Sequence, residues 1–154
     1  MDYLTIKWLH ILSSTILFGT GIGSAFYMLM ANRGKQLGHI GFATAHVVIA
    51  DWIFTTPAII FQLLSGFYLM HLGGYHFTDK WIAGALGLFV FVGFCWIPVV
   101  WMQIKMRDMA RKAQLTHQAL PDRYWVYDRW WIVLGSLAFP AVIAIFWLMV
   151  EKPV

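Results

Sequence analysis

The chain has 154 residues, of which 60% are hydrophobic and only 12% are charged. A soluble domain of this size carries about twice that charged fraction, so the composition excludes an ordinary water-soluble domain. The net charge of +4 comes with no folded basic surface, and we therefore expect no nucleic-acid partner. A single cysteine, Cys95, rules out a disulfide framework within one chain.

Four long apolar runs dominate the sequence, and each is long enough to cross a bilayer, which takes about 20 helical residues. The runs are Leu4–Ala31, Val47–Leu72, Trp81–Met102 and Trp130–Val150. The first run is too long for a cleavable signal peptide and has no basic lead. We predict an all-α integral membrane four-helix bundle in contact with lipid. A single domain over residues 1–154 would contain helices at about 4–31, 42–72, 81–112 and 128–150.

Basic residues are distributed very unevenly between the two sides of the predicted bundle. Eight of the 11 lysines and arginines follow the first or the third run: Arg33, Lys35, Lys105, Arg107, Arg111, Lys112, Arg123 and Arg129. Loops rich in Lys and Arg stay in the cytoplasm. We therefore expect a multi-pass protein of the bacterial inner (cytoplasmic) membrane with both termini on the periplasmic side.

The second predicted helix carries a polar stripe. At helical spacing, one face would hold Asp51, Thr55, Ala58, Gln62 and Ser65. Pro57 lies within this helix and removes a backbone hydrogen bond, so we expect an interruption there. An ionisable group such as Asp51 costs about 2.5–3.5 kcal/mol at a helix centre on insertion scales. Asp51 is thus a candidate catalytic residue acting as a proton relay, with a hydrogen-bonded packing role as the alternative.

Histidines are the chemically distinctive side chains, at positions 10, 39, 46, 71, 76 and 117. Imidazole is a usual ligand of haem iron, and a four-helix bundle can hold such a ligand between facing helices. His10 shares a helix face with small residues and would lie about 10 Å from the midplane, against about 16 Å for His71. Helical phase places His71 and His46 together, opposite the Asp51 stripe.

Several segments together carry a resemblance that covers nearly the whole chain. They are Lys7–His10 (KWLH), Asp51–Ala58 (DWIFTTPA), Gly66, Cys95–Gln103 (CWIPVVWMQ) and Met149–Pro153 (MVEKP). In these the chain resembles a bacterial family of predicted four-helix integral membrane proteins of unknown function. More distantly it is similar to the HemJ-type protoporphyrinogen oxidases. The shared marks are Lys-x-x-His in the first helix, a Pro-Ala followed by Gly, and a Lys-Pro near the C-terminus.

The distant similarity implies a haem b bound through His10. This similarity does not imply that the protein oxidises porphyrinogens. Ala85 stands where those proteins have a lysine early in the third helix, and their Tyr-His pair is absent. A membrane oxidoreductase of another kind remains compatible with the resemblance.

These observations lead to one main functional expectation and two alternatives. The main one is a haem b protein that transfers electrons to or from a quinone, a porphyrinogen or a partner protein. His10 and His71 would be the ligands of the haem iron. His46 would be a reserve ligand or the anchor of a second haem. The alternatives are a haem-free transporter or channel component using the Asp51–Gln62 stripe, which would need a homo-oligomer, and a structural subunit of a membrane complex.

Overall fold

The fold is entirely helical in the computed structural model, which describes residues 2–153. The elements are α1 (Tyr3–Gly34), α2 (Leu37–Ala50), η1 (Asp51–Thr55), α3 (Thr56–Gly73), α4 (Lys80–Thr116) and α5 (Asp122–Glu151). The π-helical segment η1 joins α2 and α3 into one continuous helix, Leu37–Gly73. Within the described residues, four helices are therefore long and apolar enough to cross a membrane. The predicted all-α four-helix membrane fold is confirmed.

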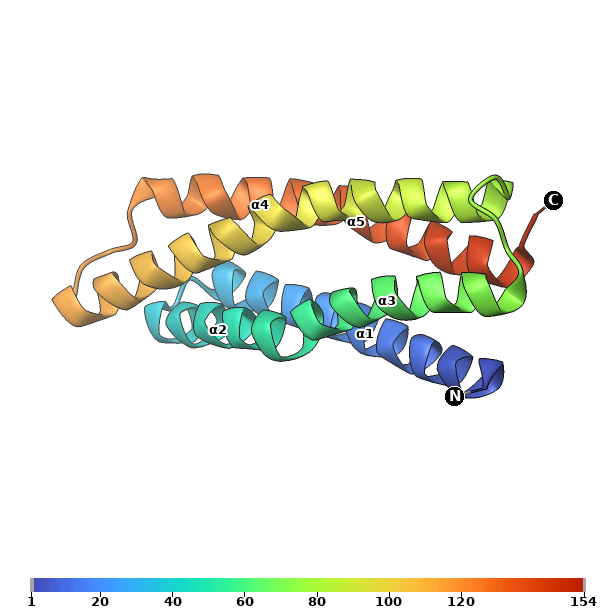
Figure 1. The fold of residues 1–154 in the computed structure, drawn as a ribbon. Coiled ribbons are helices and arrows are strands. Elements are labelled where there is room, and N and C mark those ends of the chain that lie inside the picture. Colours follow the sequence, from blue (N-terminus) through green and yellow to red (C-terminus); the bar gives the residue numbers. More distant parts are fainter. Residues whose placement is uncertain (1, 154) are drawn as a thin grey trace.

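The helices form two antiparallel hairpins (Figure 1). In one, α1 packs along α2 and α3; in the other, α4 packs along α5. The hairpins meet mainly where α2 lies against α4, whereas the backbone of α3 makes no extensive contact with α4 or α5 among the described residues. We call the end formed by residues 33–39 and 105–129 the basic end. Both termini lie at the opposite end (Figure 1).

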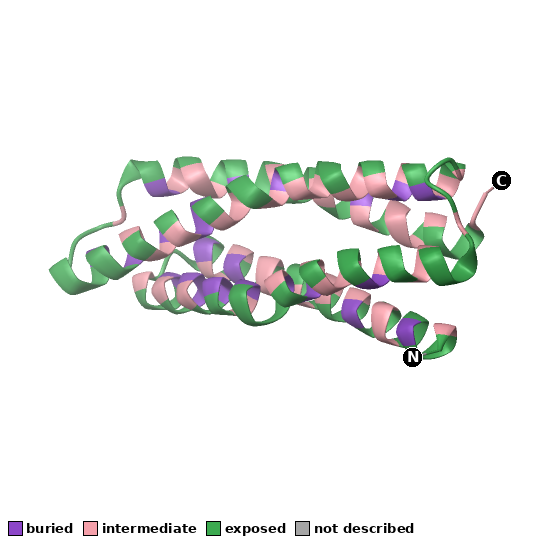
Figure 2. Cartoon of the chain, viewed as in Figure 1, coloured by how far each residue is buried: buried purple, intermediate pink, exposed green. Residues whose placement is uncertain are grey.

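The buried core lies toward the basic end, as Figure 2 shows. Its members come from all four spans: Met28, Ile40, Val47, Met102, Met106, Ala110, Tyr124 and Trp131. Elsewhere, large apolar side chains such as Phe26, Phe94 and Trp147 are exposed. Exposed apolar side chains on spanning helices face lipid, whose hydrocarbon is as apolar as they are. Packing between the two hairpins is thus concentrated in one half of the molecule.

Pro57 explains the short π-helical segment. A proline has no N–H to donate, and its ring collides with the carbonyl four residues earlier in a regular α-helix. Here the N–H of Thr56 donates to the carbonyl of Asp51, five residues back, which is the π-helical pattern. The interruption predicted near Pro57 is present, and its form is one wide turn that begins at Asp51.

The connection between α4 and α5 is shorter than the predicted gap between residues 112 and 128. Helix α4 ends when His117 adopts a left-handed conformation (φ 52°), and α5 begins directly after Pro121. The early residues of α5 are polar in sequence but remain helical because Tyr124 is fully buried in the core. Tertiary burial therefore extends this helix beyond its apolar run.

At the opposite end, Lys152 joins the end of α5 to the connection between α3 and α4. Its Nζ donates a hydrogen bond to the hydroxyl of Tyr75 (3.0 Å) and lies 4.8 Å from the Tyr75 ring centroid and 5.3 Å from that of Trp81. The hydrogen bond and positive charge of Lys152 lower the pKa of the Tyr75 phenol, because both stabilise the phenolate. Phe18 of α1 also stacks on Phe139 of α5, with ring centroids 5.2 Å apart.

Candidate functional site

His10 lies half-buried between α1 and α3, and a serine fixes its imidazole. Its Nδ1 is 2.7 Å from Oγ of Ser65. The hydroxyl oxygen of Ser65 also lies 2.5 Å from the carbonyl oxygen of Phe61. We assign the hydroxyl proton to this carbonyl, the shorter of the two contacts; Ser65 then accepts from His10, and the neutral imidazole carries its proton on Nδ1 and its lone pair on Nε2. This tautomer is the one in which Nε2 can bind a metal.

The other ring nitrogen of His10 has no hydrogen-bond partner among residues 2–153. It is also not sealed inside the protein, because no buried side-chain nitrogen or oxygen of the described residues lacks a partner. An imidazole whose second nitrogen donates to a neighbouring group is the usual arrangement of a metal-binding histidine. Among the described residues, no group of three His, Cys, Asp or Glu side chains could hold a metal ion.

The surrounding contacts hold this turn of α1 against α3. Gln62 donates its side-chain Nε2 to the carbonyl of His10 (2.6 Å), and Ser13 donates its hydroxyl to the carbonyl of Ala58 (3.3 Å). A Cβ at Gly66 would lie 3.5 Å from Cε1 of the His10 ring, at ordinary contact distance. The second half of the predicted polar stripe, Ala58, Gln62 and Ser65, thus lies in the seam between α1 and α3 and is hydrogen-bonded there.

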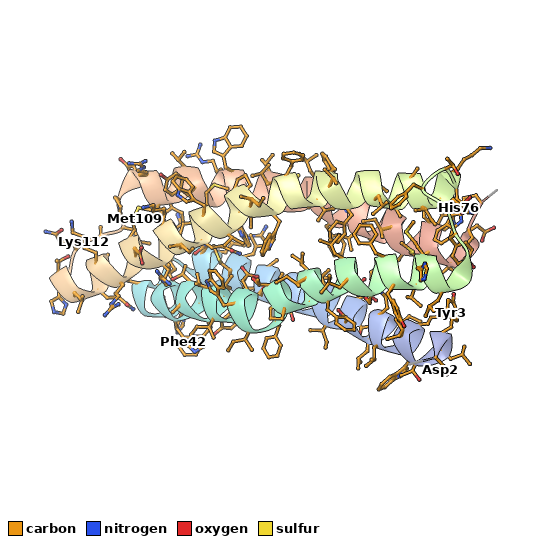
Figure 3. All side chains as sticks on the ribbon, viewed as in Figure 1. Asp2, Tyr3, Phe42, His76, Met109 and Lys112 are labelled. Atoms are coloured by element: carbon orange, nitrogen blue, oxygen red, sulfur yellow. The ribbon has the colours of Figure 1, made fainter. Side chains whose placement is uncertain are left out.

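The structure does not place His71 or His46 beside His10. His71 is exposed, six residues beyond Ser65 and therefore about 9 Å further along α3. His46 is exposed on α2, with Nδ1 2.8 Å from the carbonyl of Phe42 and its ring 3.9 Å from the Phe42 ring. Figure 3 shows Phe42 on the side of α2 away from α4. The ligand roles of His71 and His46 remain predictions.

Asp51 is the centre of a buried polar cluster that joins three of the spans. Its Oδ1 accepts from the hydroxyl of Thr55 (2.9 Å). With the Gln103 amide oriented to satisfy both of its ends, Nε2 donates to Oδ2 of Asp51 (2.6 Å) and Oε1 accepts from Nε1 of Trp131 (3.2 Å). Asp51 is 5% exposed, and among the described residues no cation lies within ion-pair distance of it. A carboxyl buried among neutral donors can exchange a proton, or it can simply pack.

A second buried polar cluster was missed by the sequence reasoning. Asn32, near the end of α1, donates its side-chain Nδ2 to Oδ1 of Asp128 (2.6 Å) and accepts from the hydroxyl of Tyr124 (2.7 Å) at its Oδ1. The sequence signal was weak, because all three residues stand next to polar loop segments. The spacing of Tyr124 and Asp128, one helical turn apart, could have placed them on one face.

A model of a family described as predicted integral membrane proteins, DUF2269, matches residues 4–153. The chain belongs to this family. The match covers all four spanning helices as well as His10, Ser65 and Asp51, so the site lies within the part that defines the family. No curated protein and no solved structure matches the chain. The description of the family states that its members are predicted integral membrane proteins and names no activity.

Proposed function

We propose that this protein binds haem b in the membrane and serves a redox role, with His10 as an axial ligand. The observation that carries the proposal is the 2.7 Å contact between His10 Nδ1 and the hydroxyl of Ser65, which leaves Nε2 as the ring nitrogen without a partner among the described residues. The distant similarity to the HemJ-type oxidases, in which the matching histidine is associated with haem, supports the same residue.

Each residue of the site has a defined task in this proposal. His10 would bind the iron through Nε2, Ser65 would fix its tautomer, and Gln62 would hold the backbone of that turn through the His10 carbonyl. When bound, haem supplies one-electron chemistry at its iron. His71 is the candidate for the opposite ligand, and His46 is the candidate anchor of a second haem.

The electron partner is proposed to be a quinone, a porphyrinogen or another protein, in the bacterial inner membrane. With a quinone or a porphyrinogen, Asp51 would relay the accompanying proton. The transporter alternative is less well supported, because the polar groups of the stripe it requires are already hydrogen-bonded, Gln62 to α1 and Asp51 to Thr55 and Gln103. Transport of a solute along this stripe would require water or the solute to replace these side-chain hydrogen bonds.

The visible spectrum of the purified protein, expressed with ample haem supply, tests the proposal. We expect a Soret band in the wild type and its loss in His10→Ala, because the variant lacks the iron ligand. In Ser65→Ala the ligand remains but its orientation is no longer fixed. We therefore expect haem affinity to fall by about tenfold or more, as for other partners of metal ligands.

His76→Ala provides the matched control, since His76 lies at the same end of the bundle and has no proposed ligand role. It should keep the full spectrum. His71→Ala and His46→Ala, measured alongside, decide the second ligand and the second haem. A colourless wild-type preparation, or a Soret band that survives in His10→Ala, would contradict the proposal.

A further inference from the structure

The basic end contains a charged hollow between α4 and α5, with a volume of about 310 Å³. Its lining residues are Lys105, Asp108, Met109, Lys112, Arg123 and Tyr127. Figure 3 labels Met109 and Lys112 on this part of α4, where the helix continues past its apolar run. The hollow thus follows the apolar part of α4, and in a membrane it would lie at the level of the headgroups.

The hollow has an excess of positive charge. Asp108 is its only acidic residue, and the carboxylate is paired with Arg107 outside the lining, whose Nε and Nη2 lie 3.0 and 2.8 Å from Oδ1. Lys105 and Lys112 are seven residues apart and so lie on one face of α4. Arg123 faces them from α5. Three cations from two helices therefore surround one space.

Aromatic side chains hold two of these cations in place. The Nε of Arg123 donates to the hydroxyl of Tyr127 (2.8 Å), and its guanidinium carbon lies 5.3 Å from the Tyr127 ring centroid. The Nζ of Lys105 lies 5.9 Å from the ring of Trp101, which itself packs edge-to-face against Tyr127 at 5.4 Å. Trp and Tyr favour the headgroup level of a membrane, and a cation over such a ring is attracted to it.

We propose that this hollow is a binding site for the headgroup of an anionic phospholipid, with the phosphate between Lys105, Lys112 and Arg123. Basic pockets between helices at the headgroup level suit such lipids. The only carboxylate of the hollow is already paired, so nothing there favours the ammonium of a zwitterionic lipid. The site is independent of haem binding. The predicted topology places it in the cytoplasmic leaflet.

Native mass spectrometry of the detergent-purified protein tests this site, with phosphatidylglycerol and phosphatidylcholine of the same acyl chains as probes. We expect wild type to retain phosphatidylglycerol preferentially. A cation in contact with the bound headgroup contributes about a fivefold preference, so Arg123→Gln should lower the retention of phosphatidylglycerol by about that factor. Replacing all three cations with Gln should abolish the preference.

Arg129→Gln is the matched control, because it removes the same charge from the same end of α5 but outside this hollow. Tyr127→Phe keeps every charge and removes only the group that orients Arg123, so a drop of about twofold is expected. Lys112 is exposed, and Lys112→Gln tests the site without risk to folding. The proposal fails if wild type shows no preference for phosphatidylglycerol, or if Arg129→Gln weakens it as much as Arg123→Gln does.

Discussion

The contacts of Asp51 are compatible with two roles for its side chain, proton transfer and packing. Both oxygens of its carboxylate accept hydrogen bonds, from Thr55 and Gln103, and the side chain lies at the first residue of the π-helical segment. Such wide turns occur often at functional sites. The same hydrogen bonds would also suit a purely structural group, because a buried polar atom must be paired. The two roles differ in whether the carboxyl exchanges a proton.

Asp51→Asn separates these roles. The amide keeps the shape of the carboxyl but cannot carry a proton between partners, so a relay predicts at least a tenfold slower reduction, by duroquinol, of the haem that we propose at His10. The Soret band should remain, because His10 is untouched. Stopped-flow absorbance at the Soret maximum measures the rate.

Thr55→Val is the control for Asp51→Asn. It removes one hydrogen bond from the same carboxylate while leaving the carboxyl itself in place, and it should keep the rate within about twofold while costing about 1 kcal/mol of stability. An unchanged rate in Asp51→Asn would assign Asp51 to packing alone.

At the residue level, the sequence singled out His10 and the stripe that contains Ser65, but not the contact between these two residues. The depth of His10 and the polar stripe of the second helix both follow from helical spacing, and Ser65 was on that stripe. The tautomer of His10 could not be predicted, because it depends on the two contacts of the Ser65 hydroxyl, with His10 and with Phe61. The contact with His10 exists only once α1 and α3 are packed.

Element by element, the spanning helices follow from their apolar runs, whereas their ends do not. From the sequence, the first residues of α5 are predicted to be part of a polar connection. They are helical because Tyr124 and Asp128 form hydrogen bonds with Asn32 of α1. Two adjacent serines of α1 show a similar limit. Ser13 rather than Ser14 reaches α3, while the Ser14 hydroxyl bonds to the carbonyl of Ile11 in its own helix. A run that is apolar on every side does not specify its inward face.

Tyr124→Phe measures how strongly this cluster joins α1 to α5. The substitution removes the only donor to Oδ1 of Asn32 among the described residues and leaves that oxygen buried, which costs about 1–3 kcal/mol. Unfolding of the protein in mixed micelles by added SDS, followed by circular dichroism, gives the free energy. Tyr68→Phe, at an exposed position on α3, should change it by less than about 0.5 kcal/mol. Equal stability of the two variants would show that the cluster contributes little.

At the scale of the whole molecule, the distribution of lysine and arginine predicts how the bundle is oriented. The structure places residues 33–39 and 105–129 at one end and both termini at the other, so all eight clustered cations lie together. This arrangement is what the positive-inside rule requires of a single orientation. The side on which the basic end lies is still a prediction.

Labelling of single cysteines with a membrane-impermeant maleimide tests that orientation. In a Cys95→Ala background, which removes the one buried native thiol, cysteines are introduced by Thr78→Cys and Gln118→Cys at exposed positions of the two ends. In spheroplasts we expect the first variant to be labelled and the second only after permeabilisation. The reverse pattern would place the termini in the cytoplasm.

The uneven joining of the two hairpins has a consequence for how the protein responds to its surroundings. The core joins them at the basic end. Toward the termini, the described links are the contacts of the Phe18 ring with Phe139 and Phe146 and the Lys152–Tyr75 hydrogen bond. Lateral pressure and hydrophobic mismatch act on the spacing between helices wherever internal packing is sparse. Bilayer thickness should therefore change the separation of α3 from α4 near the termini and leave the basic end unaltered. His10 lies in the half of the molecule that would respond.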